Sequence, residues 1–132
     1  MNLRCDWLIL CERAYVDANG NYCLTGIFER SRPLPGELDV NLRDRTAVAF
    51  LRGEPGQVVD VSLALHGPDG EVLVNMPTEP RALHHEFGTG QTEWTLVEFR
   101  LAVGSYEFRL HEVGAVIAVA PLEIFAPKDT AV

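Results

Sequence analysis

Alternation of apolar and polar residues is the sequence feature that most restricts the fold of this chain. Val59, Val61, Leu63 and Leu65 alternate with polar or small residues up to His66, and successive side chains of a β-strand point to opposite faces. This pattern predicts a strand with one buried face, while the helical period of about 3.6 residues is nearly absent from the chain. The sequence therefore predicts an all-β protein.

Turn residues separate the apolar runs and predict antiparallel hairpins. Residues 17–20 contain Asn19-Gly20, a pair that tolerates the positive φ angles of a tight turn, and residues 67–70 place Pro68 where a turn needs a fixed φ. About eight strands result. They are expected over residues 5–11, 22–28, 46–51, 59–66, 72–74, 93–101, 106–110 and 115–125. Residues 77–90 form the longest irregular stretch, and such loops are often functional.

Consecutive hairpins without a helix long enough for a crossover favour two antiparallel sheets packed face to face. The chain of 132 residues matches one domain that buries roughly two thirds of its unfolded surface. We expect a single β-sandwich domain over residues 1–126 and a flexible C-terminal tail over 127–132.

Charge and cysteine content restrict the partners and the compartment. A net charge of -8 disfavours nucleic acid and anionic membranes as partners. The N-terminal apolar run is too short for a secretory signal, and residues 115–122 are too short to span a bilayer, so we expect a cytoplasmic protein. Cys5, Cys11 and Cys23 match no zinc or redox spacing and are expected to be reduced, the alternative being a cross-strand pairing of Cys23 with Cys5 or Cys11.

Several of these segments together resemble a known family. They are Leu8-Ile9-Leu10-Cys11-Glu12, the turn at 17–20 followed by Leu24-Thr25-Gly26-Ile27-Phe28, the reversal at 67–70 and Gly104-Ser105-Tyr106-Glu107-Phe108. In this order they resemble a family of small uncharacterised bacterial β-sandwich proteins, a domain of unknown function. The resemblance implies an immunoglobulin-like fold and a bacterial cytoplasmic setting, and it brings no catalytic residues.

No catalytic motif stands out, so we expect no enzyme and no cofactor. The serines lie outside any Gly-x-Ser-x-Gly context, and residues 88–90 lack the lysine of a phosphate loop. The carboxylate pairs Glu37/Asp39 and Glu93/Glu98 are explained by the density of acidic residues. His84, His85 and Glu86 are the only weak metal candidates, because adjacent histidines on an extended chain point to opposite sides.

Two functional hypotheses from different classes remain. The first is a non-enzymatic protein-interaction or scaffolding module that binds a protein partner or itself through a sheet edge or face. The alternative is a small-ligand or carbohydrate-binding sandwich that uses the 77–90 loop and an exposed aromatic residue, with Trp94 and Tyr22 as candidates. Trp7 and Trp94 are both expected in the core, although an exposed indole could stack on a sugar ring.

Overall fold

The computed structural model describes residues 3–126 as strands, turns and loops, with no helix in that range. The expected C-terminal tail at 127–132 lies outside the described residues. The strands are β1 (Arg4–Val16), β2 (Tyr22–Ile27), β3 (Arg30–Ser31), β4 (Asp39–Asn41), β5 (Thr46–Arg52), β6 (Val58–Val59), β7 (Val61–His66), β8 (Val72–Pro77), β9 (Arg81–Ala82), β10 (Thr89–Thr95), β11 (Arg100–Ala102), β12 (Gly104–Glu112) and β13 (Ala115–Ile124).

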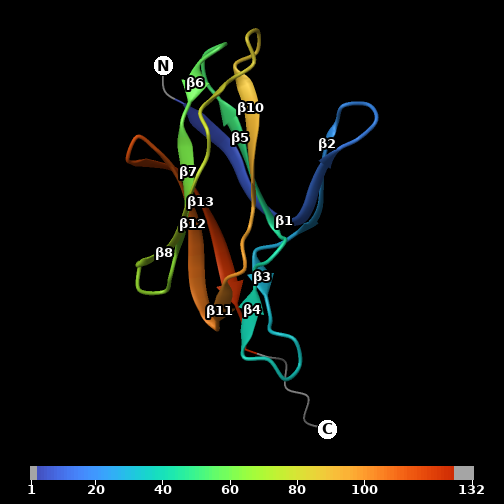
Figure 1. The fold of residues 1–132 in the computed structure, drawn as a ribbon, viewed down its shortest axis with the longest axis vertical. Coiled ribbons are helices and arrows are strands. Elements are labelled where there is room, and N and C mark those ends of the chain that lie inside the picture. The colour runs from blue at the N-terminus through green and yellow to red at the C-terminus, as the bar shows by residue number, and fades with distance from the viewer. Residues whose placement is uncertain (1–2, 127–132) are drawn as a thin grey trace.

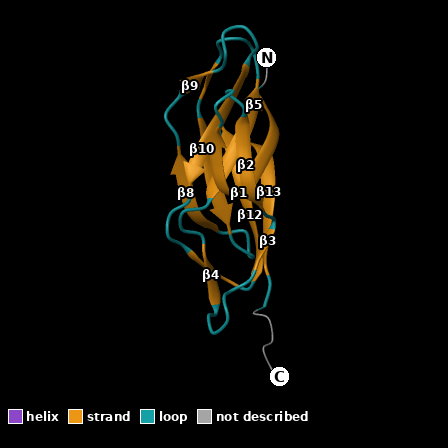
Figure 2. Ribbon diagram, turned by 90° about the vertical axis from the view of Figure 1, so that its right-hand side faces the viewer, coloured by secondary structure: helices purple, strands orange, loops and turns teal. Residues whose placement is uncertain are grey.

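The strands form two large sheets that pack face to face (Figures 1 and 2). One sheet has the order β10-β5-β1-β2 and the other β3-β13-β12-β7-β8, and only the β3–β13 pairing is parallel. Two small sheets, β4 with β11 and β6 with β9, complete the described chain. The all-β antiparallel sandwich is therefore confirmed, although residues 3–126 form thirteen strands instead of the eight expected. The five additional strands are only two or three residues long.

The path of the chain between the sheets is that of an immunoglobulin-like sandwich. The chain passes from β1 and β5 in one sheet to the hairpin β7–β8 in the other, returns through β10 and ends in the hairpin β12–β13. This is the Greek-key alternation of immunoglobulin domains. Tyr106 near the start of β12 donates a hydrogen bond from its hydroxyl to the carbonyl oxygen of Ala102, at 2.8 Å, which is the tyrosine corner of that fold.

The core lies between the inner faces of the two sheets, and the alternating pattern predicts it well. Val59, Val61, Leu63 and Leu65 are all buried, as the period of two indicates. From β12, Phe108 and Leu110 meet them and are fully buried. Trp94 of β10 is also in the core and donates from its indole nitrogen to the carbonyl oxygen of Met76, at 3.0 Å.

The single strand expected over 93–101 is wrong, because the chain leaves the sheet after Thr95. Leu96 remains buried, and its backbone bonds to Arg45 and Asp44 instead of to a sheet neighbour. The chain then starts β11, which pairs with β4. Residues 93–101 thus belong to two strands, β10 and β11, with a break between them.

Candidate functional site

A bent hairpin creates the most distinctive surface of the molecule. The first part of β1, from Arg4 to Cys11, pairs with β5, and its last part, from Cys11 to Val16, pairs with β2. Figure 1 shows the β1–β2 hairpin, in blue, turning away from the sheet and running back beside it, and Figure 2 shows β2 in front of the sheet. We call the hairpin formed by residues 11–27 the arm.

The arm covers part of the outer face of the β10-β5-β1 sheet. In β5, Ala47, Ala49 and Leu51 face the central core, so Val48 and Phe50 point to the outer face. Val48 is nevertheless fully buried, as is Cys11 at the bend. Burial of a residue on an outer face requires a covering element, and the arm supplies it.

An aromatic cluster connects the arm to the sheet. The ring of Phe50 in β5 contacts Trp7 of β1, with centroids 6.0 Å apart, and Tyr22 of β2, with centroids 5.6 Å apart. Both contacts are edge-to-face, a preferred geometry of aromatic pairs. Tyr22 therefore lies over the outer face of β5, and the indole of Trp7 is 64% exposed beside it. The expectation of a buried Trp7 is wrong.

Between the arm and the edge strand β10 the surface forms a cleft of about 380 Å³, which we call the arm cleft. It is lined by Tyr22, Arg81, Gln91, Glu93 and Thr95. The last three alternate along β10 with the buried Thr92 and Trp94, so all three point outward. Gln91 is opposite Phe50 in the strand register, which places the aromatic cluster next to the polar wall.

The hydroxyl of Tyr22 is the unusual group of the arm cleft. Its oxygen is buried, and no described residue forms a hydrogen bond with it. A buried hydroxyl without a partner costs about 1–3 kcal/mol, so proteins rarely keep one without a reason. A ligand with a hydroxyl or carbonyl group could provide the missing partner if the Tyr22 side chain rotates so that its oxygen faces the cleft.

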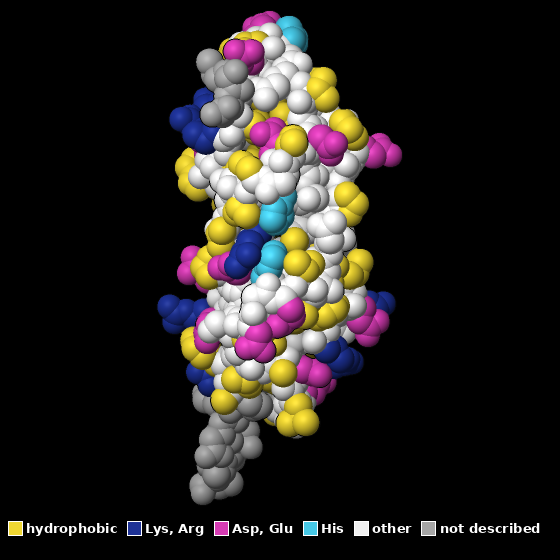
Figure 3. All heavy atoms as spheres, turned by 90° about the vertical axis from the view of Figure 1, so that its left-hand side faces the viewer, with side chains coloured by type: hydrophobic (Ala, Val, Ile, Leu, Met, Phe, Trp, Pro, Cys, Tyr) yellow, Lys and Arg dark blue, Asp and Glu magenta, His cyan; other side chains and the backbone are white. Residues whose placement is uncertain are grey.

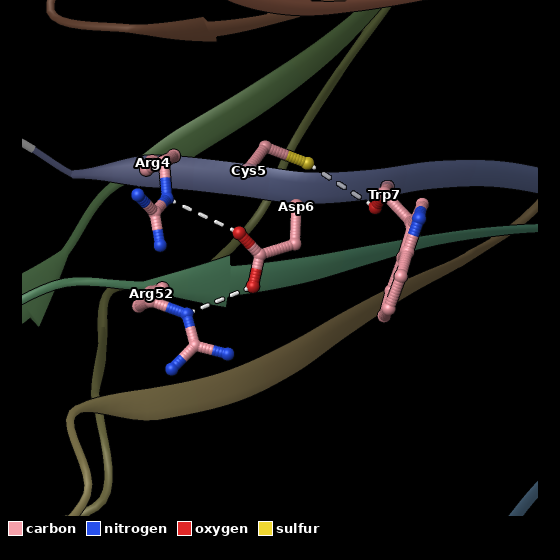
Figure 4. Close-up of polar contacts among 5 residues, drawn as sticks. All are labelled: Arg4, Cys5, Asp6, Trp7 and Arg52. Carbon is pink, nitrogen blue, oxygen red and sulfur yellow. Dashed lines mark hydrogen bonds and ion pairs between the residues drawn. The ribbon is translucent and has the colours of Figure 1, made fainter.

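A polar network holds the β1–β5 pair beside Trp7. The Asp6 carboxylate accepts hydrogen bonds from Arg52, at 2.9 Å, and from Arg4, at 3.2 Å (Figure 4). The hydrogen bond from Arg52 is the main cause that lowers the pKa of Asp6 below its ordinary value. The register of β1 against β5 shifts between Cys5 and Trp7, so Cys5 packs against the core while Trp7 lies on the outer face.

Two of the cysteines and two of the serines have surroundings that do not activate them as nucleophiles. Burial raises the pKa of the Cys5 thiol to about 11, and burial also raises that of Cys11, so neither forms a thiolate readily. All three cysteines are free. The hydroxyl of Ser105 donates to Glu123 at 2.6 Å, and that of Ser31 accepts from Arg45. These contacts indicate structural roles for both serines.

One member of each carboxylate pair singled out in the sequence has an ordinary partner as well. Asp39 forms an ion pair with Arg100 at 3.0 Å, which occupies one member of the pair with Glu37. Glu98 accepts from the side-chain amide of Asn41, whereas Glu93 lines the arm cleft. Glu98 is therefore engaged by Asn41, a residue that does not line the arm cleft beside Glu93.

The histidine pair of the long loop has a different arrangement from the one expected. His84 and His85 do not point to opposite sides, because residues 85–87 form a turn that stacks the two rings 4.7 Å apart. Nδ1 of His84 accepts from the backbone N–H groups of Glu86 and Phe87, so this nitrogen serves the turn. Within residues 3–126, no group of three or more histidine, cysteine or acidic side chains could hold a metal ion.

Of the two aromatic residues proposed from the sequence, the structure brings only Tyr22 to the cleft. Trp94 is 5% exposed and cannot contact a ligand on the surface. Trp7 was expected in the core, and the sequence did not single out Arg81, Gln91 or Thr95. Polar residues occupy alternate positions of β10 at Gln91, Glu93 and Thr95. This alternation was the one signal that could have indicated a hydrophilic outer face on β10.

The fold and the arm cleft define an immunoglobulin-like β-sandwich with a polar surface site. An immunoglobulin-like protein from Pseudomonas aeruginosa is among the similar solved structures, with a TM-score of 0.47 and 10% identity over 94% of this chain and 97% of that chain. No protein-family model matches the sequence, and no curated protein matches it. A search of residues 3–126 for helices able to span a bilayer finds none.

Proposed function

We propose that this chain is a non-enzymatic binding module whose arm cleft holds a small, hydroxyl-rich ligand of the carbohydrate class. The observation that carries the proposal is the buried, unpartnered hydroxyl of Tyr22 at the wall of a cleft of about 380 Å³. Pockets of roughly 300–1,000 Å³ hold small molecules. A ligand in the cleft can satisfy this hydroxyl once a small rotation of the Tyr22 side chain uncovers its oxygen.

The chemistry of the lining supports a sugar better than a charged ligand. Gln91 and Thr95 both donate and accept hydrogen bonds, Glu93 accepts and Arg81 donates, and this mixture matches the paired donor and acceptor character of sugar hydroxyls. Trp7 lies on the other side of Phe50 from the cleft residue Gln91, and its exposed indole can pack against the apolar face of a sugar ring that extends beyond the cleft. A single arginine in a protein of charge -8 does not favour a polyanion.

Tryptophan fluorescence tests this proposal, because the two indoles differ in exposure. A panel of monosaccharides and oligosaccharides is titrated into the protein, and a ligand is expected to shift the emission of Trp7, which is 64% exposed, but not that of the buried Trp94. Tyr22→Phe removes one hydrogen bond to the ligand, worth about 1 kcal/mol, and should weaken binding about fivefold. The fold should tolerate this change, because the hydroxyl has no protein partner among the described residues.

Tyr15→Phe is the matched control, because Tyr15 is on the same arm but does not line the cleft. Its affinity for the ligand should equal that of the unchanged protein. Equal losses in the two tyrosine variants, or an emission change that persists after Trp7→Phe, would contradict the arm cleft as the binding site.

A second candidate function is self-association through the open edge of β13, the sheet-edge interaction expected from the sequence. Along Ala115–Leu122 the described backbone has no strand partner on the side away from β12, since β3 pairs only with Glu123 and Ile124. This stretch has no charged residue, and Val116 and Val119 are each 48% exposed. A second copy could pair antiparallel to it without opposing like charges, despite the acidic surface elsewhere.

Size-exclusion chromatography with light scattering measures the oligomeric state and therefore tests this second function. A dimer is expected at micromolar concentration, and Val119→Lys should convert it to a monomer, because a lysine on an edge blocks strand pairing. Val58→Lys is the control, since Val58 is 67% exposed in the short strand β6. A monomer at every concentration of the unchanged protein would rule the edge dimer out.

We propose the same cellular setting for this binding module as the sequence predicts. A bacterial cytoplasmic protein, grouped with the small β-sandwich proteins that it resembles and independent of nucleic acid and membranes, is consistent with the acidic composition. The three free thiols suit a reducing compartment.

A further inference from the structure

A pair of histidines occupies the outer face of the other large sheet, opposite the arm. His66 ends β7 and His111 lies near the end of β12, and in both strands the alternate residues Leu65 and Leu110 face the core. Figure 3, which views this side of the molecule, shows two histidine side chains close together in the middle of the face. Their ring centroids are 6.2 Å apart and the rings are inclined by 32°.

His66 is buried and has one unpartnered nitrogen. The residue is 6% exposed, and its Nδ1 lies 3.1 Å from the carbonyl oxygen of Gly70. Because a carbonyl only accepts, Nδ1 must carry the proton, and Nε2 of the neutral ring then holds a lone pair. That Nε2 is buried and no described residue forms a hydrogen bond with it.

This is the arrangement of a metal-binding histidine. Histidines that bind metals almost always donate their other ring N–H to a carboxylate or a backbone carbonyl, which fixes the tautomer and the ring orientation. The Gly70 carbonyl does this for His66. The unused Nε2 would be the ligand atom, and it is on the same outer face as the second imidazole.

The two rings are close enough for one ion after a small adjustment. With Zn–N bonds of roughly 2.0–2.1 Å, two imidazoles on one tetrahedral zinc ion have ring centres about 5 Å apart. The observed separation of 6.2 Å is longer, and a rotation of the half-buried His111 side chain would close the difference. We therefore propose that His66 and His111 form a two-histidine site for a divalent transition-metal ion, with water completing the coordination.

Two features of the sheet around the pair support this site. An irregular register accompanies each histidine: Leu73 is an extra residue in β8 beside His66, and Ile117 is an extra residue in β13 beside His111. Such bulges are frequent next to functional sites, where they re-aim side chains. The charged neighbours on this face are Glu107, opposite His66, and Arg109, and they form an ion pair with each other. Their charges balance, so no net positive charge is added beside the ion.

Isothermal titration of the purified full chain with Zn²⁺ tests the proposal. One ion per chain is expected to bind with micromolar affinity, and Cu²⁺ should bind more tightly while Mg²⁺ should not bind, as expected for imidazole ligands. His111→Ala and His66→Gln should each weaken Zn²⁺ binding at least about tenfold. His84→Ala combined with His85→Ala is the matched control and should leave the affinity unchanged.

A second measurement separates coordination from a general effect on folding. In nitrogen-15 NMR spectra of the histidine rings, Zn²⁺ should shift Nε2 of His66 and leave its protonated Nδ1 in place. Binding that survives His111→Ala, binding lost only in the loop variant, or no binding at millimolar Zn²⁺ would each overturn the proposal. The arm cleft is in the other sheet, so these outcomes are independent of sugar binding.

Discussion

Replacing Phe108 with alanine should lower the free energy of unfolding by about 3–5 kcal/mol, because it opens a large cavity in a closely packed core. Phe108 is fully buried in the central strand β12, where it lies opposite Leu65 on one side and Ala120 on the other. Both large sheets contribute to the cluster around it. Urea unfolding followed by circular dichroism measures the loss.

Val72→Ala is the control for that substitution. Val72 belongs to the same sheet but is 59% exposed, so its truncation should change the stability by no more than about 0.5 kcal/mol. If the two variants lost similar stability, Phe108 would not be at the centre of the core as the structure places it.

Replacing Gly88 with alanine should cost about 3 kcal/mol or more, for two physical reasons that act together. Gly88 has a φ of +64°, where side chains are strained, and an added Cβ would overlap the backbone carbonyl of Gly53. The same two residues are joined by a hydrogen bond from Gly53 N–H to the Gly88 carbonyl oxygen, at 2.8 Å. The backbone therefore has little freedom to move away, and the melting temperature should fall markedly.

Gly20 separates the two causes. It also has a positive φ, +82°, but a Cβ there would meet nothing within 4 Å. Gly20→Ala should therefore cost only the conformational penalty, about 1 kcal/mol. Equal losses at the two glycines would show that the close contact between Gly88 and Gly53 contributes nothing.

The sequence predicted those parts of the fold in which one face of a strand is polar and the other apolar. Val61, Leu63 and Leu65 specify the inward face of β7 without ambiguity, and Asn19-Gly20 marks the β1–β2 hairpin because few pairs accept that turn. The prediction of one strand over residues 93–101 was wrong because Leu96 is buried in a loop and not in a sheet. Strands of two residues, such as β6 and β9, contain no period that a pattern could detect.

The candidate site was less predictable, because it depends on a bend in β1 that no local signal marks. Tyr22 and Phe50 are far apart in the sequence and meet only because the arm folds back over β5. Trp7 appears in an apolar run and was assigned to the core, yet the register shift beside Cys5 turns it outward. His66 and His111 are on neighbouring strands but are not register partners, and their rings approach because the two side chains lean toward each other along the sheet.

Amide NMR spectra of the isotopically labelled protein, recorded with and without the strongest ligand from the sugar panel, test the central claim most directly. The largest shifts should fall on Tyr22, Gln91, Glu93 and Thr95, the residues that line the arm cleft together with Arg81. They should become smaller in Tyr22→Phe. Shifts gathered on the β13 edge or spread evenly over the surface, with the cleft residues unchanged, would contradict the assignment of the arm cleft as the binding site.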